Sequence, residues 1–365
     1  MENVYHVGLD VHKETAEMSI FSNQEQEPFF ETKLPGDEKR IVEALKKLQR
    51  KGEVHTCYEA GCMGFTLKRA LDEAGIDCRI VSPGKVPRKP GERIKTDRRD
   101  ARNLARLLRA GEVEGIYIPS KEDEATRDYI RARDDVKLDL KRAKQQLLKF
   151  LLRYGHRYET NRYWTGRHRQ WMKGINFSQP MHKETFETYN ARILELEERL
   201  VLMDARIVEI AQSERYQKTV NILRCFKGID YLIALSFVCE VGDFRRFRNA
   251  GAFMAYLGLI PREHSSGEKR RQGGITKSGN GHLRRLLVEA AWHYRYQSTP
   301  GRSLTIRRIG QKTEVIAYAD KALRRLQKKF AKMLFKGKSK NNAVIAVSRE
   351  LAGFIWGAMN NKIAA

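Results

Sequence analysis

Several features are missing from this chain of 365 residues, and each absence excludes a class of protein. No apolar stretch approaches the length of a membrane span. The N-terminus lacks a signal-peptide pattern because acidic residues precede any long apolar run. The five cysteines are odd in number and have no paired spacing, which excludes a disulfide framework. The absences predict a cytoplasmic protein with no membrane partner.

Two familiar binding motifs are also incomplete. His55, Cys57 and Cys62 have no second pair that would complete a zinc site, so buried thiols are expected instead. Residues 337–339 (Gly-Lys-Ser) resemble the end of a phosphate-binding loop, but Lys332 stands where that loop needs glycine. We interpret the segment as a basic loop and expect no use of ATP.

Acidic residues are outnumbered along the chain. Lys and Arg total 70 against 45 Asp and Glu, a formal net charge of +25. Such an excess repels itself in the folded state, and nucleic acid is the usual polyanion that neutralises it. Residues 266–340 alone hold twenty Lys and Arg against four acids, which predicts contact with the backbone of duplex DNA.

The pattern of apolar residues divides the chain into three parts. Residues 1–125 alternate strand and helix patterns, which is typical of an α/β domain. Residues 126–215 form a helical linker and residues 216–365 a mainly α domain. The expected strands of the first part are Val4–Leu9, Thr15–Phe21, Val54–Tyr58 and Cys78–Val81, and its expected helices are Asp37–Arg50, Gly64–Ala74 and Ala101–Ala110.

The linker carries two heptad stripes, the pattern of helices that pair along a seam in a coiled coil. They pair with each other as an antiparallel hairpin or with another subunit, and the sequence does not choose between these. The stripes consist of Val136, Leu140, Ala143, Leu147, Phe150 and Tyr154, and of Phe186, Tyr189, Ile193, Leu196, Leu200, Met203, Ile207 and Ile210.

Basic and aromatic residues are interleaved between the two stripes. Residues 140–175 contain ten Lys and Arg and a single acid, Glu159. Cations beside rings suit single-stranded nucleic acid or RNA loops, whereas a solvated helical tip with rings packed beneath it is the alternative. The candidate nucleic-acid-binding residues here are Arg153, Arg157, Arg162, Trp164, Arg167, Arg169 and Trp171.

Four carboxylates stand where the expected elements can bring them together. Asp10 closes the first strand, Glu59 closes a later strand, and Asp97 and Asp100 precede a helical run. Spacing i, i+3 places the two aspartates on one helix face. Clustered carboxylates repel unless divalent cations lie among them, and Mg²⁺ suits oxygen ligands. A strand-end acid is often merely solvated and Asp97 can be a helix cap, so this chemistry alone leaves the question open.

These carboxylates lie in segments that resemble the D-E-D-D motifs of a group of bacterial insertion-sequence transposases, the one-ten family with its eleven-eleven subgroup. The N-terminal resemblance rests on residues 8–13 (GLDVHK), 58–60 (YEA) and 95–101 (KTDRRDA). The C-terminal half resembles the transposase domain of that family through residues 242–244 (GDF), 253–262 (FMAYLGLIPR), 265–267 (SSG), 274–280 (GITKSGN) and 283–287 (LRRLL).

The resemblance implies an N-terminal ribonuclease H-like (RuvC-like) domain, similar to Holliday-junction resolvases. Asp10, Glu59, Asp97 and Asp100 would bind Mg²⁺, two ions per site, with Mn²⁺ as a substitute. The catalytic serine of the family matches Ser266, which would form a covalent phosphoserine–DNA intermediate. Members of the family also use a non-coding guide RNA of their element to pair with donor and target double-stranded DNA, and their two domains meet across subunits.

Candidate phosphate-binding residues surround the serine, namely Arg262, Lys269, Arg270, Arg271, Lys277 and Arg284. Ser265 and Ser278 are the second and third choices for the nucleophile. One stretch departs from the family, because Lys227 and Asp230 replace a proline and a glycine of a Pro-Gly-Ile-Gly turn. An acid is unfavourable beside DNA, so we do not expect a standard hairpin contact at 227–230.

Three functions compete. The first is an RNA-guided transposase or recombinase, a homodimer or homotetramer, that uses both metal and serine. The second is a metal-dependent nuclease of the Holliday-junction type that uses water as nucleophile. The third is a nucleic-acid-binding protein without enzymatic activity. The paired motif sets favour the first.

Overall fold

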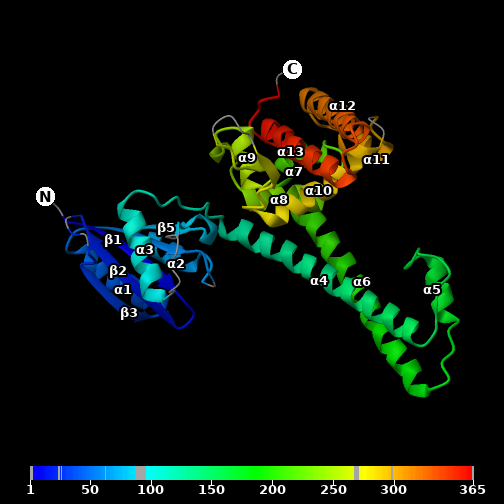
Figure 1. The fold of residues 1–365 in the computed structure, drawn as a ribbon, viewed down its shortest axis with the longest axis horizontal. Helices are drawn as coiled ribbons and strands as arrows, with labels where there is room; N and C mark the ends of the chain where they lie inside the picture. Colours follow the sequence, from blue (N-terminus) through cyan, green and yellow to red (C-terminus); the bar gives the residue numbers. More distant parts are fainter. Residues whose placement is uncertain are drawn as a thin grey trace. The chain divides into compact units, whose positions relative to one another are not determined.

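The chain folds into two compact units, Met1–Ile118 and Pro119–Ala365 (Figure 1). The structure is a computed structural model that describes residues 3–23, 25, 27–61, 63–87, 96–266, 271–296 and 299–363. An N-terminal mixed sheet with helices precedes a mainly helical C-terminal part, as predicted. Among the described residues, no helix has the length and apolar character that crossing a membrane requires.

The N-terminal unit is built on one five-stranded sheet of order β3-β2-β1-β4-β5. The central strand β1 pairs antiparallel with β2 and parallel with β4, so the sheet combines a hairpin meander with a parallel half. The strands are β1 (Val4–Val11), β2 (Thr15–Ser22), β3 (Phe30–Pro35), β4 (Glu53–Glu59) and β5 (Asp77–Val81). Strand β3 was not expected, because its half-exposed residues lack a clear apolar alternation.

Helices cover both faces of this sheet. On one face, α1 (Glu38–Gln49) and α2 (Thr66–Glu73) bury Ile41, Leu45 and Leu67 against Leu9 and Tyr58. On the other face lies α3 (Asp97–Arg109), and the short 3₁₀ turn η1 (Pro83–Lys85) follows β5. Burial on both faces explains why the middle of β1 is apolar at consecutive positions.

Strand β1 and helix α3 approach each other closely at Gly8. A Cβ atom at this position would lie well inside van der Waals contact with the Ala101 carbonyl oxygen and the Ala105 nitrogen. Helix α3 begins at Asp97, earlier than the apolar pattern indicated, because the Thr96 hydroxyl accepts a hydrogen bond from the Arg99 amide at 3.4 Å. The glycine and the cap together decide where the first turn of α3 lies.

Two long helices pair in the C-terminal unit, α4 (Lys121–Arg153) and α6 (Pro180–Ala211). They run antiparallel, because Arg133 bonds Asp204 near one end and Phe150 contacts Tyr189 near the other. The predicted stripe residues Leu147 and Ile193 are fully buried in the core between them. The stripes therefore meet within one chain, and α5 (Gly166–Lys173) lies in the connection at the tip (Figure 1).

The remaining helices enclose a second core. Helix α8 is apolar nearly all round, which is typical of a helix buried among others. A short hairpin of β6 and β7 interrupts the expected helical domain. The elements are α7 (Gln217–Arg224), α8 (Tyr231–Val241), η2 (Phe244–Arg246), α9 (Ala250–Tyr256), β6 (Pro261–Glu263), β7 (Gln272–Ile275), α10 (Gly281–Ala291), η3 (Trp292–Arg295), α11 (Arg302–Arg307), α12 (Thr313–Phe335) and α13 (Lys340–Met359).

Two smaller predictions are confirmed. Cys57, Cys78, Cys225 and Cys239 are free and buried, while Cys62 lies outside the described residues. Residues 337–339 form the connection between α12 and α13, in which the Ser339 hydroxyl caps α13 by accepting from the Asn342 amide at 3.2 Å. They are not part of a phosphate-binding loop.

We expect Gly8→Ala to destabilise the N-terminal unit by about 1–3 kcal/mol, because β1 and α3 must separate to admit the methyl group. Urea unfolding followed by circular dichroism measures the loss. The control is Gly84→Ala, since no atom lies within 4 Å of a Cβ built there. Equal stability of the two variants would contradict the close contact.

Candidate functional site

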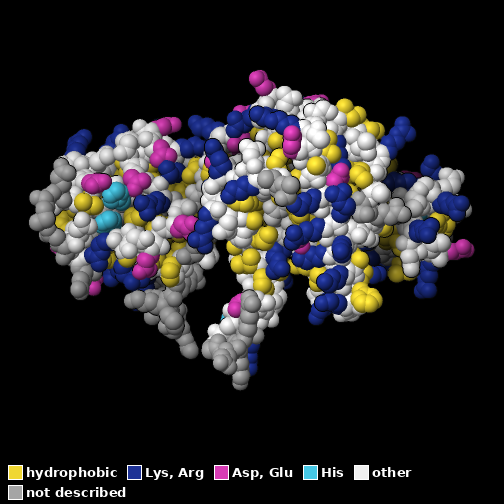
Figure 2. Space-filling view, turned by 90° about the horizontal axis from the view of Figure 1, so that it is seen from above, with side chains coloured by type: hydrophobic (Ala, Val, Ile, Leu, Met, Phe, Trp, Pro, Cys, Tyr) yellow, Lys and Arg dark blue, Asp and Glu magenta, His cyan; other side chains and the backbone are white. Residues whose placement is uncertain are grey.

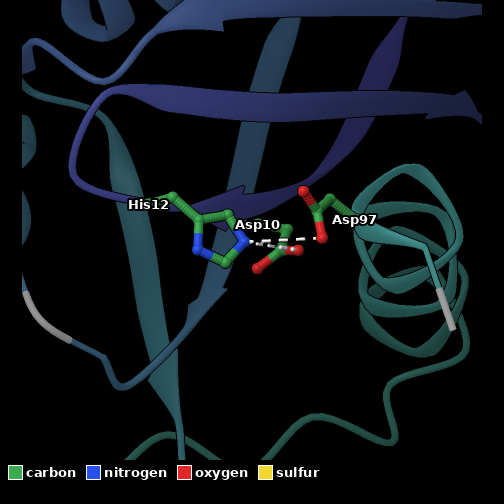
Figure 3. A group of neighbouring side chains, drawn as sticks. All are labelled: Asp10, His12 and Asp97. Atoms are coloured by element: carbon green, nitrogen blue, oxygen red, sulfur yellow. Dashed lines mark ion pairs between the residues drawn. The ribbon is translucent and has the colours of Figure 1, made fainter.

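Three side chains converge at the carboxyl end of β1. Asp10 lies near the end of the strand, His12 begins the turn to β2, and Asp97 is the first residue of α3. The His12 Nε2 atom lies 3.4 Å from Asp10 Oδ2 and 3.6 Å from Asp97 Oδ1, so one imidazole nitrogen faces both carboxylates (Figure 3). One ligand atom from each residue lies within 4.8 Å of the others. This group has the spacing of a metal site.

Glu59 and Asp100 lie outside that group but on the same side of the sheet. The parallel strands β1 and β4 pair Leu9 with Tyr58, so Asp10 and Glu59 follow at adjacent strand ends. Cys57 donates to a carbonyl of α3, and Glu59, two residues on, faces the same way. Asp100 lies one turn after Asp97. The structure thus brings Asp10 and Asp97 together, with Glu59 at the adjacent strand end and Asp100 one turn further along α3.

Burial and neighbouring charges both act on Asp10. Burial raises the pKa of Asp10, His12 opposes this shift, and the charges of Asp97 and Asp100 raise the pKa further. A divalent cation relieves such repulsion. Sequence reasoning quoted His12 within its motif but assigned it no role. The available signal was its i, i+2 spacing from Asp10, which places two side chains on one side of an extended chain.

A buried carboxylate on β3 anchors the helix that carries Asp97. Glu31 accepts from Arg98 Nε at 2.6 Å and from Arg102 Nε and Nη2 at 2.8 Å each. The Ser19 hydroxyl donates to the same carboxylate at 3.2 Å. The hydrogen bonds from Arg102, and then those from Arg98, lower the pKa of Glu31 to about 2. These contacts tie the first turns of α3 to β2 and β3.

Ser266 lies beside the β6–β7 hairpin and is exposed. The two arms of the hairpin are joined next to Ser266 by a backbone hydrogen bond, in which the His264 amide donates to the Arg271 carbonyl at 2.9 Å. The neighbouring Ser265 hydroxyl is occupied, donating to Glu263 Oε1 at 2.9 Å. Arg262 and Arg271 are exposed on the same hairpin, whereas Lys269 and Arg270 lie outside the described residues.

A tight turn follows the hairpin and ends at Asn280. Lys277 adopts a left-handed conformation (φ 58°) and is exposed, while the Ser278 hydroxyl donates to Thr276 Oγ1 at 3.1 Å. Arg284 supports the turn from within, because its Nη1 donates to the carbonyls of Leu257 at 3.0 Å and Ser278 at 3.1 Å. Lys277 is therefore free to meet a phosphate, whereas the Arg284 guanidinium is already bound to the backbone.

Residues 227–230 form a turn whose exposed acid, Asp230, pairs with arginines of the same unit. Gly228 has φ 84° and packs against the Ala290 backbone. Asp230 caps α8, and its carboxylate accepts from Arg224 Nε at 2.8 Å and lies 3.2 Å from Arg307 Nη1. Asp230, which departs from the family pattern, therefore links the start of α8 to α7 through Arg224 and to α11 through Arg307.

The rings at the hairpin tip pack around one buried histidine. His168 is fully buried, and the ring centroids of Tyr158, Trp164 and Trp171 lie 4.8, 5.4 and 5.5 Å from its own. Arg169 bonds Glu197 at 2.8 Å. The candidate residues Arg153, Arg157, Arg162 and Arg167 are exposed around this small core. The cations face solvent while the two tryptophans are half-buried.

Comparison with known proteins identifies the family. A profile of the transposase IS116/IS110/IS902 family matches residues 220–304, and a profile of the DEDD transposases of IS110 elements matches residues 7–156. The transposase for insertion sequence element IS1533 of Leptospira borgpetersenii is 42% identical over 90% of this chain and 96% of its own length. The chain belongs to the IS110 family of insertion-sequence transposases. This confirms the resemblance seen in the motifs.

Other transposases extend the comparison. A putative transposase of Sinorhizobium fredii, y4qE, is 37% identical over 96% of this chain and 87% of its own length. The transposase for IS1111A of Coxiella burnetii is 25% identical over 79% and 72% of the two chains. The present transposase is therefore a DNA recombination enzyme with DNA substrates, and its DEDD class is associated with divalent metal.

We expect Glu31→Gln to lower the free energy of unfolding at pH 7 by about 1–2 kcal/mol. The value is kept small because solvent screens the exposed partners Arg98 and Arg102. Because the folded pKa lies below the ordinary 4.5, this contribution is present above about pH 5 and is lost as the pH falls toward 2. Urea unfolding at pH 7 and pH 3 measures it. Glu43→Gln, which breaks only an exposed pair with Arg40, serves as control. A difference that persists undiminished at pH 3 would refute the assignment.

Proposed function

We propose that this transposase cuts and rejoins DNA with a carboxylate metal site in the N-terminal unit and a serine nucleophile, Ser266, in the C-terminal unit. The observation that carries the proposal is the convergence of Asp10, from strand β1, and Asp97, from helix α3. A mixed sheet whose central strand ends in an acid is compatible with a ribonuclease H-like fold. The paired helices α4 and α6 would be the coiled-coil part of the enzyme.

The residues present fit a divalent cation. Asp10 and Asp97 offer carboxylate oxygens within 4.8 Å of each other, and Glu59 and Asp100 lie nearby to complete a DEDD set for Mg²⁺ or Mn²⁺, two ions per site. A bound cation would neutralise charge on the scissile phosphate. The His12 Nε2 atom lies 3.4 Å from Asp10 and 3.6 Å from Asp97, within reach of the same site. We propose that His12 is a further ligand.

Ser266 is the nucleophile in this proposal. Its exposure on the hairpin suits attack on a DNA phosphate, whereas the hydroxyls of Ser265 and Ser278 are each engaged in a hydrogen bond. The serine Oγ forms a bond to phosphorus while the bond from phosphorus to one sugar oxygen breaks, and the proton that the serine loses is balanced by one that this sugar oxygen gains. The freed strand ends as a sugar hydroxyl. Attack by a hydroxyl of the partner strand reverses the step, so no ATP is consumed.

Cations around the serine would hold the DNA backbone. Arg262, Arg271 and Lys277 are exposed near it and suit phosphate contacts, with Lys269 and Arg270 proposed from the sequence alone. Arg284 would act by holding the turn that presents Lys277. We further propose that the arginines at the hairpin tip contact a guide RNA, and that the enzyme works as a homodimer or homotetramer.

Covalent attachment tests the nucleophile. The transposase is incubated with a DNA junction of its element, the RNA of the element and Mg²⁺, and denaturing gels are scanned for DNA bound to protein. We expect an adduct that disappears in Ser266→Ala, in Asp10→Asn and with a chelator, while Ser265→Ala retains it. Cleavage without any adduct would replace the serine with water and leave a metal-dependent junction nuclease.

Metal affinity tests His12. We expect His12→Ala to weaken Mn²⁺ binding about tenfold or more and to affect Mg²⁺ less, because an imidazole nitrogen suits the softer ion. Titration calorimetry on the full chain measures both affinities. His55→Ala is the control, since that histidine pairs with Asp77 at 2.8 Å on another strand. Tighter metal binding in His12→Ala would make the imidazole a competitor of the metal.

A further inference from the structure

Helix α12 has two unlike sides. One side packs into the core through Ala319, Leu323, Leu326 and Phe330. The opposite side carries a line of exposed cations spaced three or four residues apart, which places them one above another along the helix. This cationic stripe consists of Lys321, Arg324, Lys328 and Lys332.

The stripe has no acid to balance it. Within the described part of the chain its four cations make no ion pair, whereas the neighbouring Arg325 and Lys329 both pair with Glu350, the latter at 2.6 Å. Asp320 is likewise taken, by Arg308 at 2.7 Å. Like charges one turn apart destabilise a helix, so an uncompensated stripe points to an anionic partner.

The dimensions of the stripe match a DNA strand. Eleven residues separate Lys321 from Lys332, a rise of about 16 Å, over which one strand of duplex presents about five phosphates. Figure 2 views the C-terminal unit from the side on which Figure 1 shows α12 and α13, and Lys and Arg greatly outnumber acids there. A duplex backbone laid along α12 would meet cations along its length.

An aromatic ring stands at the end of the stripe. Phe335 is the last residue of α12, three residues after Lys332, and 94% of its surface is exposed. Lys336 and Lys338 follow it and are also exposed. A solvated ring among cations suits stacking on an unpaired base, which costs the folded protein nothing because the ring has no packing to give up.

We propose that the outer side of α12 is a DNA-binding surface separate from the residues around Ser266. The duplex backbone lies along the cationic stripe, and Phe335 stacks on the first unpaired base where duplex gives way to single strand. The inference rests on the proposed function only in taking DNA as the substrate. It requires neither the serine nor the metal.

Salt-dependent binding tests the stripe. Anisotropy of a labelled blunt duplex is followed against KCl in EDTA, with the full chain and with a quadruple variant in which Lys321, Arg324, Lys328 and Lys332 are changed to Gln. We expect weaker binding and a salt slope reduced by about one unit for each cation that contacts a phosphate. The charge-matched control changes four exposed cations of α1 and its C-cap, Lys39, Lys46, Lys47 and Arg50, to Gln.

The outcomes are distinct. Equal losses in the two quadruple variants would show an effect of net charge alone, and an unchanged slope in the stripe variant would overturn the surface. A loss for an RNA hairpin but not for the duplex would assign the stripe to RNA and also overturn the proposal. Thermal melting checks that both variants fold. Binding is measured in EDTA, where the metal-dependent step does not occur, so failure of the nucleophile does not mimic failure of the stripe.

A forked substrate tests Phe335. We expect Phe335→Ala to weaken binding to a duplex with a single-stranded arm at least about fivefold, to leave blunt duplex unaffected, and to be rescued by Phe335→Trp. Equal effects on forked and blunt DNA, or no effect on the fork, would overturn the stacking contact.

Discussion

The candidate metal site depends on how closely helix α3 approaches strand β1. Because Gly8 has no side chain, the helix backbone rests directly on the strand, and one turn before that contact lies Asp97, beside Asp10 at the strand end. Glu31 secures the same helix from the sheet side through Arg98 and Arg102. The packing at Gly8 and the ion pairs of Glu31 thus hold the charged residues at the end of β1, where the pKa of Asp10 is raised.

The C-terminal unit folds with a large excess of positive charge. Its few buried acids are each shared by several donors. Glu240 accepts from Arg131 at 2.9 Å and from Asn280 at 2.9 Å, and Asp123 accepts from Arg215 and from the Tyr216 hydroxyl. With these acids engaged in the interior, the exposed cations of the α12 stripe have no acidic partner among the described residues. That division of charge is what a protein that binds a polyanion requires, since the missing counter-charge is supplied by the ligand.

At the tip of the α4–α6 hairpin, aromatic residues that the composition suggested for nucleic-acid contact take part in packing instead. Aromatic rings that look available for base stacking in the sequence instead surround His168, where they shield an imidazole that lacks any hydrogen-bond partner among the described residues. Burial lowers the pKa of that histidine. Trp164 and Trp171 then contribute to a small core, and the exposed arginines around it remain the part of the tip that a nucleic acid can reach first.

Much of this protein could be predicted from its sequence. The strand runs, the heptad stripes, the charge excess and the family motifs are local patterns, and Asp10 and Asp97 are found from them. The three-dimensional structure was needed to show that His12 joins these aspartates, that the stripes pair within one chain, and that Asp230 pairs with arginines. The reason is physical. Periodicity specifies which side of an element a residue occupies, whereas distances between elements depend on strand order, register and close contacts such as the one at Gly8.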